Sequence, residues 1–241
     1  MPTNEERAQS LLKELDRTQK GRKTKRPFFI EITGSPDSGK STIIDILDPF
    51  FRRQNYNVFT PQEGAEAIRH IPRTSHLYNI RTGLYALVTL IDASVNEKYD
   101  LVIFDRCLHD AISWLGYWVK KKDIDINEAV LLENFFCFPT WFDMLDASFF
   151  VITTPEEAIR RDQSVSLTKK FGGTTNPESI KNLVEIFTKT FETQLSISEL
   201  KKELFNKEEK IFLIDTTNME RAEMAEMVLE KTLSALEKRF T

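Results

Sequence analysis

Residues 34–41 carry the sequence feature that most limits how this chain can fold. Gly34-Ser35-Pro36-Asp37-Ser38-Gly39-Lys40-Ser41 matches the phosphate-binding pattern G-x-x-x-x-G-K-[ST] without a gap. It follows the apolar run 28–33 and precedes a helical pattern that begins at Lys40. A glycine-rich loop in this position lets backbone N–H groups point at phosphate oxygens at a helix N-terminus. The sequence therefore predicts a strand–loop–helix unit that binds a nucleoside triphosphate.

The polar side chains of this region have expected roles. Lys40 is predicted to reach the β and γ phosphates, and the Ser41 hydroxyl is predicted to be a Mg²⁺ ligand. Asp105 follows four apolar strand residues, which is the Walker B arrangement of a carboxylate near the metal. It is expected either to orient a Mg²⁺ water or to accept the proton of an attacking hydroxyl. The predicted nucleotide-binding residues are Gly34, Ser35, Asp37, Ser38, Gly39, Lys40, Ser41 and Thr42.

Short apolar segments alternate with helical patterns from residue 27 onward. The expected strands are 28–33, 57–60, 100–104, 147–152 and 210–214. The expected helices are 3–19, one from Lys40, 77–97, most of 110–145, one from Pro155, and one from Asn218 to about Lys238. This alternation predicts a three-layer α/β/α P-loop NTPase fold with a parallel five-stranded sheet. Residues 1–26 are expected to form an N-terminal helix and a basic linker, ahead of one domain over 27–241.

Composition limits the partners and the compartment. The 33 Lys and Arg residues stand against 37 Asp and Glu, and this balance argues against a surface adapted as a whole to nucleic acid. Cys107 and Cys137, the only cysteines, have no metal-ligand spacing. The sequence has no apolar run long enough for a membrane span and no signal-peptide pattern at its N-terminus. A cytoplasmic protein without membrane partners is therefore expected.

Three features together resemble the thymidylate kinase and deoxynucleoside kinase group of P-loop kinases. They are the phosphate-binding loop, the Asp105-Arg106 pair after an apolar strand, and the segment 154–161 with Arg160 and Arg161. The resemblance covers about residues 27–238 and implies an ATP-dependent kinase that uses Mg²⁺. It also implies a basic LID segment, here about 156–176, whose arginines stabilise the transferring phosphoryl group. Lys169 and Lys170 are further LID candidates.

The acceptor region departs from the usual signatures of that group. Neither an acidic-Pro-Gly sequence after the second strand nor a Glu-Arg-Ser sequence after the third is intact. Glu63 stands where an acceptor-binding or base carboxylate of the group would stand, and a helix N-terminal acid is the alternative interpretation. Arg69, Arg73 and Arg81 are expected on the acceptor side, where arginines suit a phosphorylated acceptor. The predicted acceptor-binding residues are Glu63, Arg69, Arg81 and Arg106.

Aromatic residues offer one further acceptor contact. The candidates for a base-stacking contact are Trp114, Tyr117, Trp118, Trp141 and Phe142, whereas Phe135-Phe136-Cys137-Phe138 and its neighbours are assigned to the core.

The predicted function is phosphoryl transfer from ATP to a nucleoside, nucleotide or similar small acceptor. The predicted catalytic residues are Lys40, Asp105, Glu63, Arg160 and Arg161, and the predicted metal ligands are Ser41 and Asp105. Two alternatives stay open: a nucleotide-dependent switch whose output is a partner contact, and a kinase for a nucleic-acid end. The acidic balance counts against the second alternative, and the absence of an Asn/Thr-Lys-x-Asp guanine signature counts against a GTPase switch. A homodimer is a further expectation.

Overall fold

The computed structural model of the chain describes residues 2–19, 26–165, 174–193, 195, 197 and 210–239. Its strands form one parallel sheet in the order β2–β3–β1–β4–β5. They are β1 (Phe28–Gly34), β2 (Val58–Phe59), β3 (Leu101–Asp105), β4 (Ala147–Ile152) and β5 (Ile211–Asp215). The predicted parallel five-stranded sheet is therefore confirmed.

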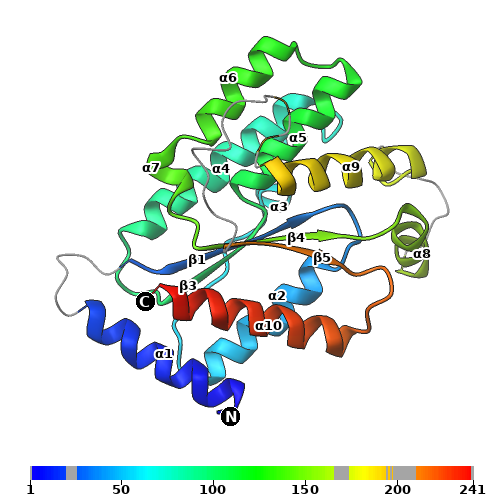
Figure 1. Cartoon of the computed structure of the whole chain (residues 1–241). Coiled ribbons are helices and arrows are strands. Elements are labelled where there is room, and N and C mark those ends of the chain that lie inside the picture. Colours follow the sequence, from blue (N-terminus) through cyan, green and yellow to red (C-terminus); the bar gives the residue numbers. More distant parts are fainter. Residues whose placement is uncertain are drawn as a thin grey trace.

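Helices cover both faces of the sheet (Figure 1). One face carries α4 (His76–Ser94), α5 (Leu108–Lys121), α6 (Ile126–Phe136), α7 (Pro139–Phe142) and α9 (Pro177–Thr193). The other face carries α1 (Asn4–Gln19), α2 (Lys40–Arg53) and α10 (Arg221–Lys238). The short α3 (Gly64–Ala67) follows β2, and α8 (Pro155–Val165) follows β4. The predicted three-layer α/β/α fold is confirmed.

Two hydrophobic cores lie on the two faces of the sheet. Successive strand residues point to opposite faces, so Phe29 packs in the core beside α5, whereas Phe28 and Ile30 pack in the core beside α2 and α10. Glu31 follows this alternation and points to the α5 side, where it is fully buried. A buried carboxylate in a strand needs hydrogen-bond donors, and the site described below contains them.

The N-terminal helix α1 belongs to the core on the α10 side. Ala8, Leu11 and Leu15 are buried there together with residues of α2 and α10. The Tyr56 hydroxyl donates to the Ala8 carbonyl at 2.8 Å, and Arg7 Nε donates to Glu237 at 2.9 Å. The predicted helix is thus present, and it is packed against the sheet's helical layer. None of the helices within the described ranges is long and apolar enough to cross a membrane.

Helix α9 is the longest helix that the sequence analysis did not expect. At the start of α9, the Asn176 side chain accepts a hydrogen bond from the Ser179 N–H at 2.9 Å. Its buried residues Ile180, Leu183 and Phe187 recur at helical spacing. A capping residue and this periodicity were therefore the available signals. The predicted LID segment ends at residue 176, directly before α9 begins at Pro177.

Strand β1 lies at the point where the chain changes direction in the sheet. Its neighbours are β3 on one side and β4 on the other. In parallel sheets the loops on either side of such a strand diverge at its carboxyl end and leave a crevice for ligands. The predicted phosphate-binding loop follows β1 at this place.

Candidate active site

The loop after β1 has the backbone that a phosphate-binding loop requires. Gly34 has a φ of 140°, and a Cβ atom there would lie 1.8 Å from the carbonyl oxygen of Val151 on β4. Gly39 has a φ of 99°, in the left-handed region, immediately before α2. Only glycine adopts both conformations without strain, and only glycine leaves space for Val151. The first glycine of the motif is therefore required by the contact with β4.

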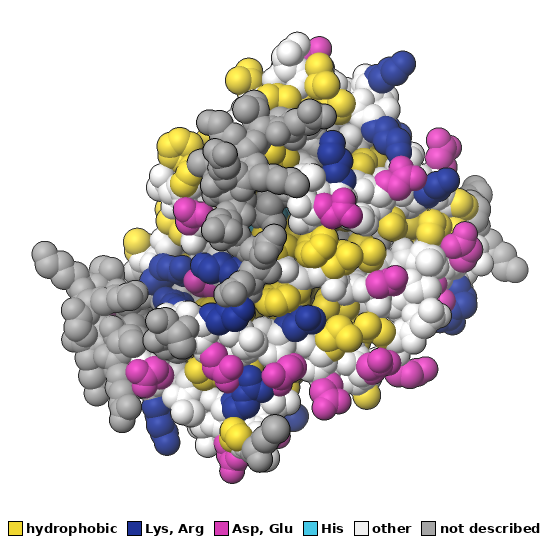
Figure 2. Space-filling view, viewed as in Figure 1, with side chains coloured by type: hydrophobic (Ala, Val, Ile, Leu, Met, Phe, Trp, Pro, Cys, Tyr) yellow, Lys and Arg dark blue, Asp and Glu magenta, His cyan; other side chains and the backbone are white. Residues whose placement is uncertain are grey.

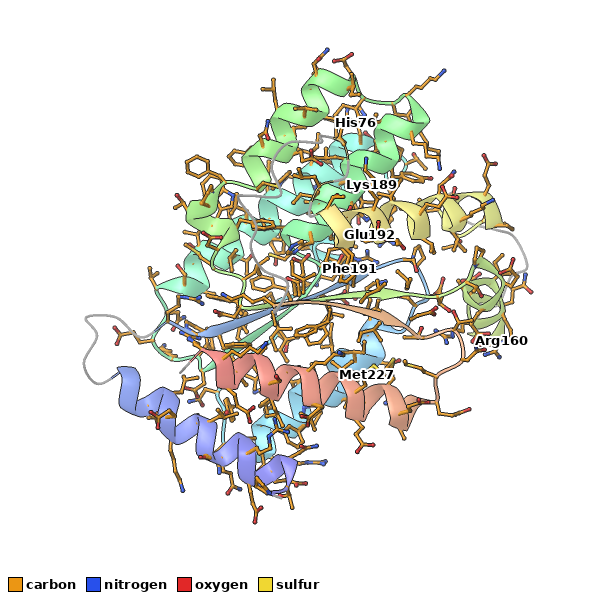
Figure 3. The ribbon with its side chains drawn as sticks, viewed as in Figure 1. His76, Arg160, Lys189, Phe191, Glu192 and Met227 are labelled. Atoms are coloured by element: carbon orange, nitrogen blue, oxygen red, sulfur yellow. The ribbon has the colours of Figure 1, made fainter. Side chains whose placement is uncertain are left out.

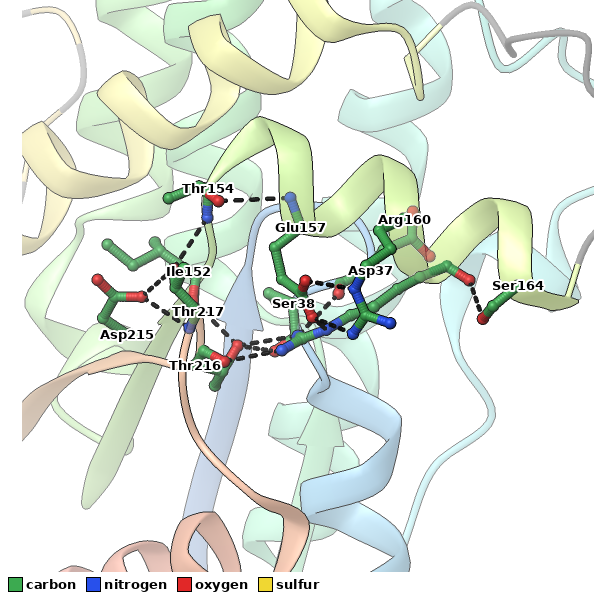
Figure 4. A network of polar contacts seen from close by, with 11 residues as sticks. Asp37, Ser38, Ile152, Thr154, Glu157, Arg160, Ser164, Asp215, Thr216 and Thr217 are labelled. Atoms are coloured by element: carbon green, nitrogen blue, oxygen red, sulfur yellow. Dashed lines mark hydrogen bonds and ion pairs between the residues drawn. The ribbon is translucent and has the colours of Figure 1, made fainter.

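Donors outside the loop hold its carbonyl groups (Figure 4). The Thr216 hydroxyl, after β5, donates to the Ser38 carbonyl at 2.7 Å, and Arg161 Nη1 donates to the Asp37 carbonyl at 3.2 Å. Within the described residues, the backbone N–H groups of Asp37, Ser38 and Gly39 have no hydrogen-bond acceptor. They lie at the N-terminus of α2, where the helix dipole favours an anion. The loop therefore fits a polyphosphate.

Lys40 is the buried cation of the loop. Its Nζ atom donates to the Ser35 carbonyl at 2.6 Å. Burial, together with the positive charge of Arg106, lowers the pKa of Lys40 to about 7, although Asp105 and Asp110 attract the ammonium group. An anion in the loop would favour the charged form of Lys40.

Asp105 and Ser41 lie where a divalent metal would fit. Asp105 ends β3 opposite Ile32 of β1, and its Oδ1 atom is buried without a hydrogen-bond partner among the described residues. Burial raises the pKa of Asp105, and the charges of Arg106 and Lys40 oppose this rise. A buried carboxylate oxygen without a partner is unfavourable, and Mg²⁺ prefers oxygen ligands of this kind. Since Ser41 lines the same cavity, the two predicted ligands fit Mg²⁺.

Arg106 connects the carboxyl ends of β1 and β3 with the acceptor side. Its backbone is left-handed, with a φ of 70°, and its N–H donates to the Ile32 carbonyl at 3.0 Å. Its Nε donates to Glu63 at 2.8 Å, and its Nη1 donates to Asp110 at 2.9 Å. Burial alone would lower the pKa of Arg106, but Asp110, Glu63 and Asp105 outweigh burial and raise it. Arg106 is therefore always charged and fixes the Glu63 carboxylate.

A buried carboxylate beneath the site was missed by the sequence analysis. Glu31 accepts hydrogen bonds from the backbone N–H groups of Cys107, His109 and Asp110 at 2.8, 3.1 and 3.0 Å. Its Oε2 atom also lies 2.8 Å from His109 Nδ1. These N–H groups belong to the start of α5, where they have no partner within the helix. Glu31 therefore holds the turn that carries Arg106, and its only sequence signal was an acidic residue within an apolar strand.

A cavity of about 570 Å³ joins the phosphate-binding loop to the space between α4 and α5. This volume is within the range of small-molecule sites. Glu63, Asp105 and Arg106 contribute to its lining. The α4–α5 end is lined by Tyr78, Asn79, Thr82, Gly83 and Ala86 of α4 and by Asp110, Ala111 and Trp114 of α5. The cavity therefore has a phosphate end and a more apolar end, with charged residues in its lining.

A fixed amide lies at the α4–α5 end. Trp118 Nε1 donates to Asn79 Oδ1 at 2.7 Å, and both side chains are buried. Because the amide oxygen is engaged, the Asn79 N–H groups are the donors that remain for a ligand. A Cβ atom at Gly83 would lie 2.7 Å from Ala111 Cβ and 2.8 Å from the Phe136 ring, so the helices approach closely here. Both features give this end of the cavity a defined shape.

Arg160 and Arg161 of α8 have different surroundings. Arg161 lines the cavity, and its Nη2 donates to the Thr216 carbonyl at 2.7 Å. The Arg160 side chain is 69% exposed and pairs with Glu157 at 2.6 Å. Figure 3 shows Arg160 on the outer side of α8. Hydrogen bonds from Arg160 and Arg161 lower the pKa of Glu157 to about 2. Arg161 therefore lies at the phosphate-binding loop, whereas Arg160 lies outside the cavity lining.

The structure separates the predicted acceptor arginines. Arg106 and Arg73 line the cavity. Arg69 is exposed, and its Nε donates to a backbone carbonyl three residues earlier at 3.0 Å. Arg81 lies on the exposed side of α4. Since neither Arg69 nor Arg81 lines the cavity, their roles in acceptor binding stay predictions.

The predicted aromatic candidates are divided between the cavity and the core. Trp114 lines the α4–α5 end of the cavity. The other aromatic candidates pack in the core beside α5, namely Tyr117, Trp118, Trp141 and Phe142. Lys169 and Lys170 lie outside the described residues.

Comparison with known proteins finds similarity to kinases both in sequence and in structure. No protein-family model matches the chain. A thymidylate kinase of Protochlamydia amoebophila (strain UWE25) is 25% identical over 231 residues, which cover 89% of this chain and 94% of that protein. The structure of a deoxyadenosine kinase from M. mycoides, with dCMP and a flexible dCDP bound as products, has a TM-score of 0.57 and 16% identity. That match covers 86% of this chain and 100% of the other.

Proposed function

The chain is a distant homologue of the thymidylate kinase and deoxynucleoside kinase group of P-loop kinases, and from this premise we propose that it transfers the γ-phosphoryl group of ATP to a nucleoside. One observation carries the proposal. The phosphate-binding loop and the pocket between α4 and α5 form a single cavity, and Glu63, Asp105 and Arg106 line it as well. Such a cavity brings a donor phosphate and a second small molecule together.

The phosphate end supplies positioning and positive charge. Backbone N–H groups of the loop hold phosphate oxygens, and Lys40 and Arg161 bring cations to the same end of the cavity. Ser41 and Asp105 would hold Mg²⁺, and the bound ion would neutralise charge on the phosphate oxygens. Phosphoryl transfer depends chiefly on these two contributions. The Arg161 contacts with the loop support a role in this charge stabilisation.

Glu63 serves as the general base of the proposed reaction. Its carboxylate is held at 2.8 Å from Arg106 Nε, in the lining of the cavity. A carboxylate in this position accepts the proton of an acceptor hydroxyl as the oxygen attacks phosphorus. The Asp105 oxygen that lacks a partner among the described residues supports a role as metal ligand instead. Glu63 and Asp105 thereby have different roles in the proposed reaction.

The charges of the acceptor side favour a hydroxyl acceptor over a phosphate. Arg106 is already paired with Glu63 and Asp110, and both carboxylates line the cavity. A phosphate group there would meet two negative charges, and of the three predicted acceptor-side arginines only Arg73 is in the lining. An uncharged nucleoside avoids this repulsion. The Asn79 amide then faces a hydrogen-bond acceptor on the base, and Trp114 contributes an aromatic face.

The test is ADP release from ATP and Mg²⁺ in the presence of a panel of acceptors. The panel contains ribonucleosides, deoxynucleosides, nucleoside monophosphates and short oligonucleotides, with a control that lacks any acceptor. We expect stimulation by a nucleoside, and a loss of about 10²–10⁴-fold in the stimulated rate for Glu63→Gln. Stimulation by a monophosphate alone would refute the preference for a hydroxyl. ATP binding without stimulation by any acceptor would refute the kinase and support a nucleotide-dependent switch.

A further inference from the structure

His109 is a buried side chain without a role in the reaction proposed above. It lies on the first turn of α5 and is 2% exposed. Its ring packs against two phenylalanine rings, with centroids 4.8 Å from that of Phe142 and 5.2 Å from that of Phe150. Its Nδ1 atom lies 2.8 Å from Glu31 Oε2, and its Nε2 atom has no hydrogen-bond partner among the described residues. Since an Nε2–H group would need an acceptor, a hydrogen on Nδ1 that points at Glu31 fits these surroundings.

The hydrogen bond from the His109 ring completes the surroundings of Glu31. Figure 2 shows Asp and Glu side chains spread over one face of the molecule, whereas Glu31 is fully buried in β1. Its Oε1 atom accepts from the N–H groups of Cys107 and Asp110, and its Oε2 atom accepts from the N–H group of His109. The ring of His109 is the side-chain donor in this set, and it bonds to the same Oε2 atom. A carboxylate accepts about four hydrogen bonds, so Glu31 reaches this number only when the ring takes part.

Removal of the ring donor would therefore affect the Glu31 carboxylate and the turn that it holds. A buried carboxylate oxygen that loses a donor is unfavourable, because bulk water does not replace the lost bond. The other donors to Glu31 all belong to the turn 107–110. A carboxylate that shifts toward a new partner thus displaces this turn as well.

The turn that Glu31 holds carries two charged groups of the cavity, Arg106 and Asp110. Arg106 has a φ of 70°, which is unfavourable for a residue with a side chain and persists only where the surroundings hold it. Its Nη1 atom donates to Asp110 at 2.9 Å, and its Nε atom donates to Glu63 at 2.8 Å. A short series of contacts thus leads from His109, through Glu31 and this turn, to the carboxylate that is proposed as the general base.

We infer that His109 is a positioning residue for phosphoryl transfer. Its ring fixes the Glu31 carboxylate, and the turn held in this way aims Arg106 at Glu63. The inference rests on the proposed kinase function and adds to it a residue outside the cavity lining. The alternative role of His109 is to fill space in the aromatic core beside α5. The two roles predict different results when the donor is removed and the shape of the side chain is kept.

The first test compares His109→Asn with His109→Leu. Asn and Leu have nearly the same shape, but only the Asn amide offers an N–H donor at the position of Nδ1. With a saturating acceptor, we expect His109→Leu to lower kcat by about 10–100-fold and His109→Asn to lower it by less than about threefold. The KM for ATP should change by less than about twofold in both variants. The reason is that the phosphate-binding loop is held by Thr216 and Arg161.

Ser113→Ala is the matched control for a change in the same helix. Ser113 is fully buried, and its hydroxyl donates to the His109 carbonyl at 2.8 Å, outside the contacts of Glu31. This variant should leave kcat nearly unchanged. Thermal unfolding by circular dichroism checks that all three variants fold.

The second test observes Arg106 directly and needs no turnover. The Nε–H group of Arg106 gives a side-chain NMR signal, which is identified by its loss in Arg106→Lys. In the unaltered protein and in His109→Asn, the hydrogen bond to Glu63 should slow the exchange of this hydrogen with water. In His109→Leu the exchange should be at least about tenfold faster.

The outcomes separate the inference from the proposed function. A lower kcat and faster Arg106 exchange in His109→Leu, both restored in His109→Asn, support the inference. Equal kcat values in these two variants overturn it, because the ring then only fills space, and an Arg106 signal that is the same in both also overturns it. A loss of the same size in Ser113→Ala overturns it as well. An unaltered protein without turnover on any acceptor overturns the proposed function and the transfer role together, whatever the Arg106 signal shows.

Discussion

Lys40 combines deep burial with the task of holding phosphate, and this combination makes nucleotide binding depend on pH. Its pKa is lowered to about 7, whereas a bound triphosphate favours the ammonium form and raises this pKa. The bound state therefore holds more protons than the free state at pH 8. We expect the affinity for ATP to fall by up to about tenfold per pH unit above pH 7. Calorimetry at pH 8 in two buffers of different ionisation enthalpy measures the proton uptake directly.

The Lys40→Ala variant separates this effect from other titrations. It should bind ATP weakly, take up no proton through this position, and lose phosphoryl transfer by at least about a hundredfold with an intact fold. Circular dichroism verifies the fold. Unchanged turnover would exclude Lys40 from the reaction, and proton uptake equal to that of the unaltered protein would assign the titration to another group.

Asp105→Asn tests the metal site. The amide keeps the shape of the side chain but removes the negative charge, so the Mg²⁺ concentration for half-maximal ADP release should rise about tenfold or more. Binding of ATP measured without Mg²⁺ should change much less and serves as the control. A metal titration identical to that of the unaltered protein would leave Asp105 with a structural role only.

At the scale of elements, the start of α5 depends on a carboxylate from β1. Glu31 accepts hydrogen bonds from three backbone N–H groups of this turn, and glutamine would offer one acceptor oxygen and two unwanted donors. Glu31→Gln should therefore lower the free energy of unfolding by about 2–4 kcal/mol, as measured by urea denaturation. The exposed Glu97→Gln is the control and should change it by less than about 0.5 kcal/mol. Equal stability of the Glu31 variant would refute its capping role.

Local signals explain which elements the sequence could predict. The unit from β1 to α2 was predictable because the apolar strand, the glycine positions and the helical periodicity are contiguous. The role of Glu31 was not, because its partners lie 76 to 79 residues later in the chain. The position of Arg81 depends on the direction in which a side chain leaves its helix, which the sequence analysis did not consider. It follows Asn79 by two residues, and at about 100° per residue this places it on the opposite side from the cavity.

At the scale of the whole molecule, α1 is expected to stabilise a domain that the sequence analysis begins at residue 27. Leu11 and Leu15 are buried against the layer formed by α2 and α10. Removal of residues 1–19 should lower the free energy of unfolding by about 3–6 kcal/mol. ATP affinity should stay unchanged, because α1 and the phosphate-binding loop lie at opposite ends of α2. Tyr56, which contacts α1, follows the C-terminal end of α2, whereas the loop precedes the N-terminal end of α2. A truncated protein as stable as the full chain would show that residues 20–241 fold without α1.

The hydrogen bond between Lys40 Nζ and the Ser35 carbonyl also bears on which anions this loop can retain. The Lys40 ammonium group has three donors and this bond uses one of them, so two donors remain for an incoming anion. Inorganic phosphate or sulfate reaches only some of these contacts, whereas a triphosphate reaches the N–H groups, Lys40 and the metal position together. We therefore expect the loop to retain a triphosphate more tightly than inorganic phosphate or sulfate, because the triphosphate engages more of these donors at once.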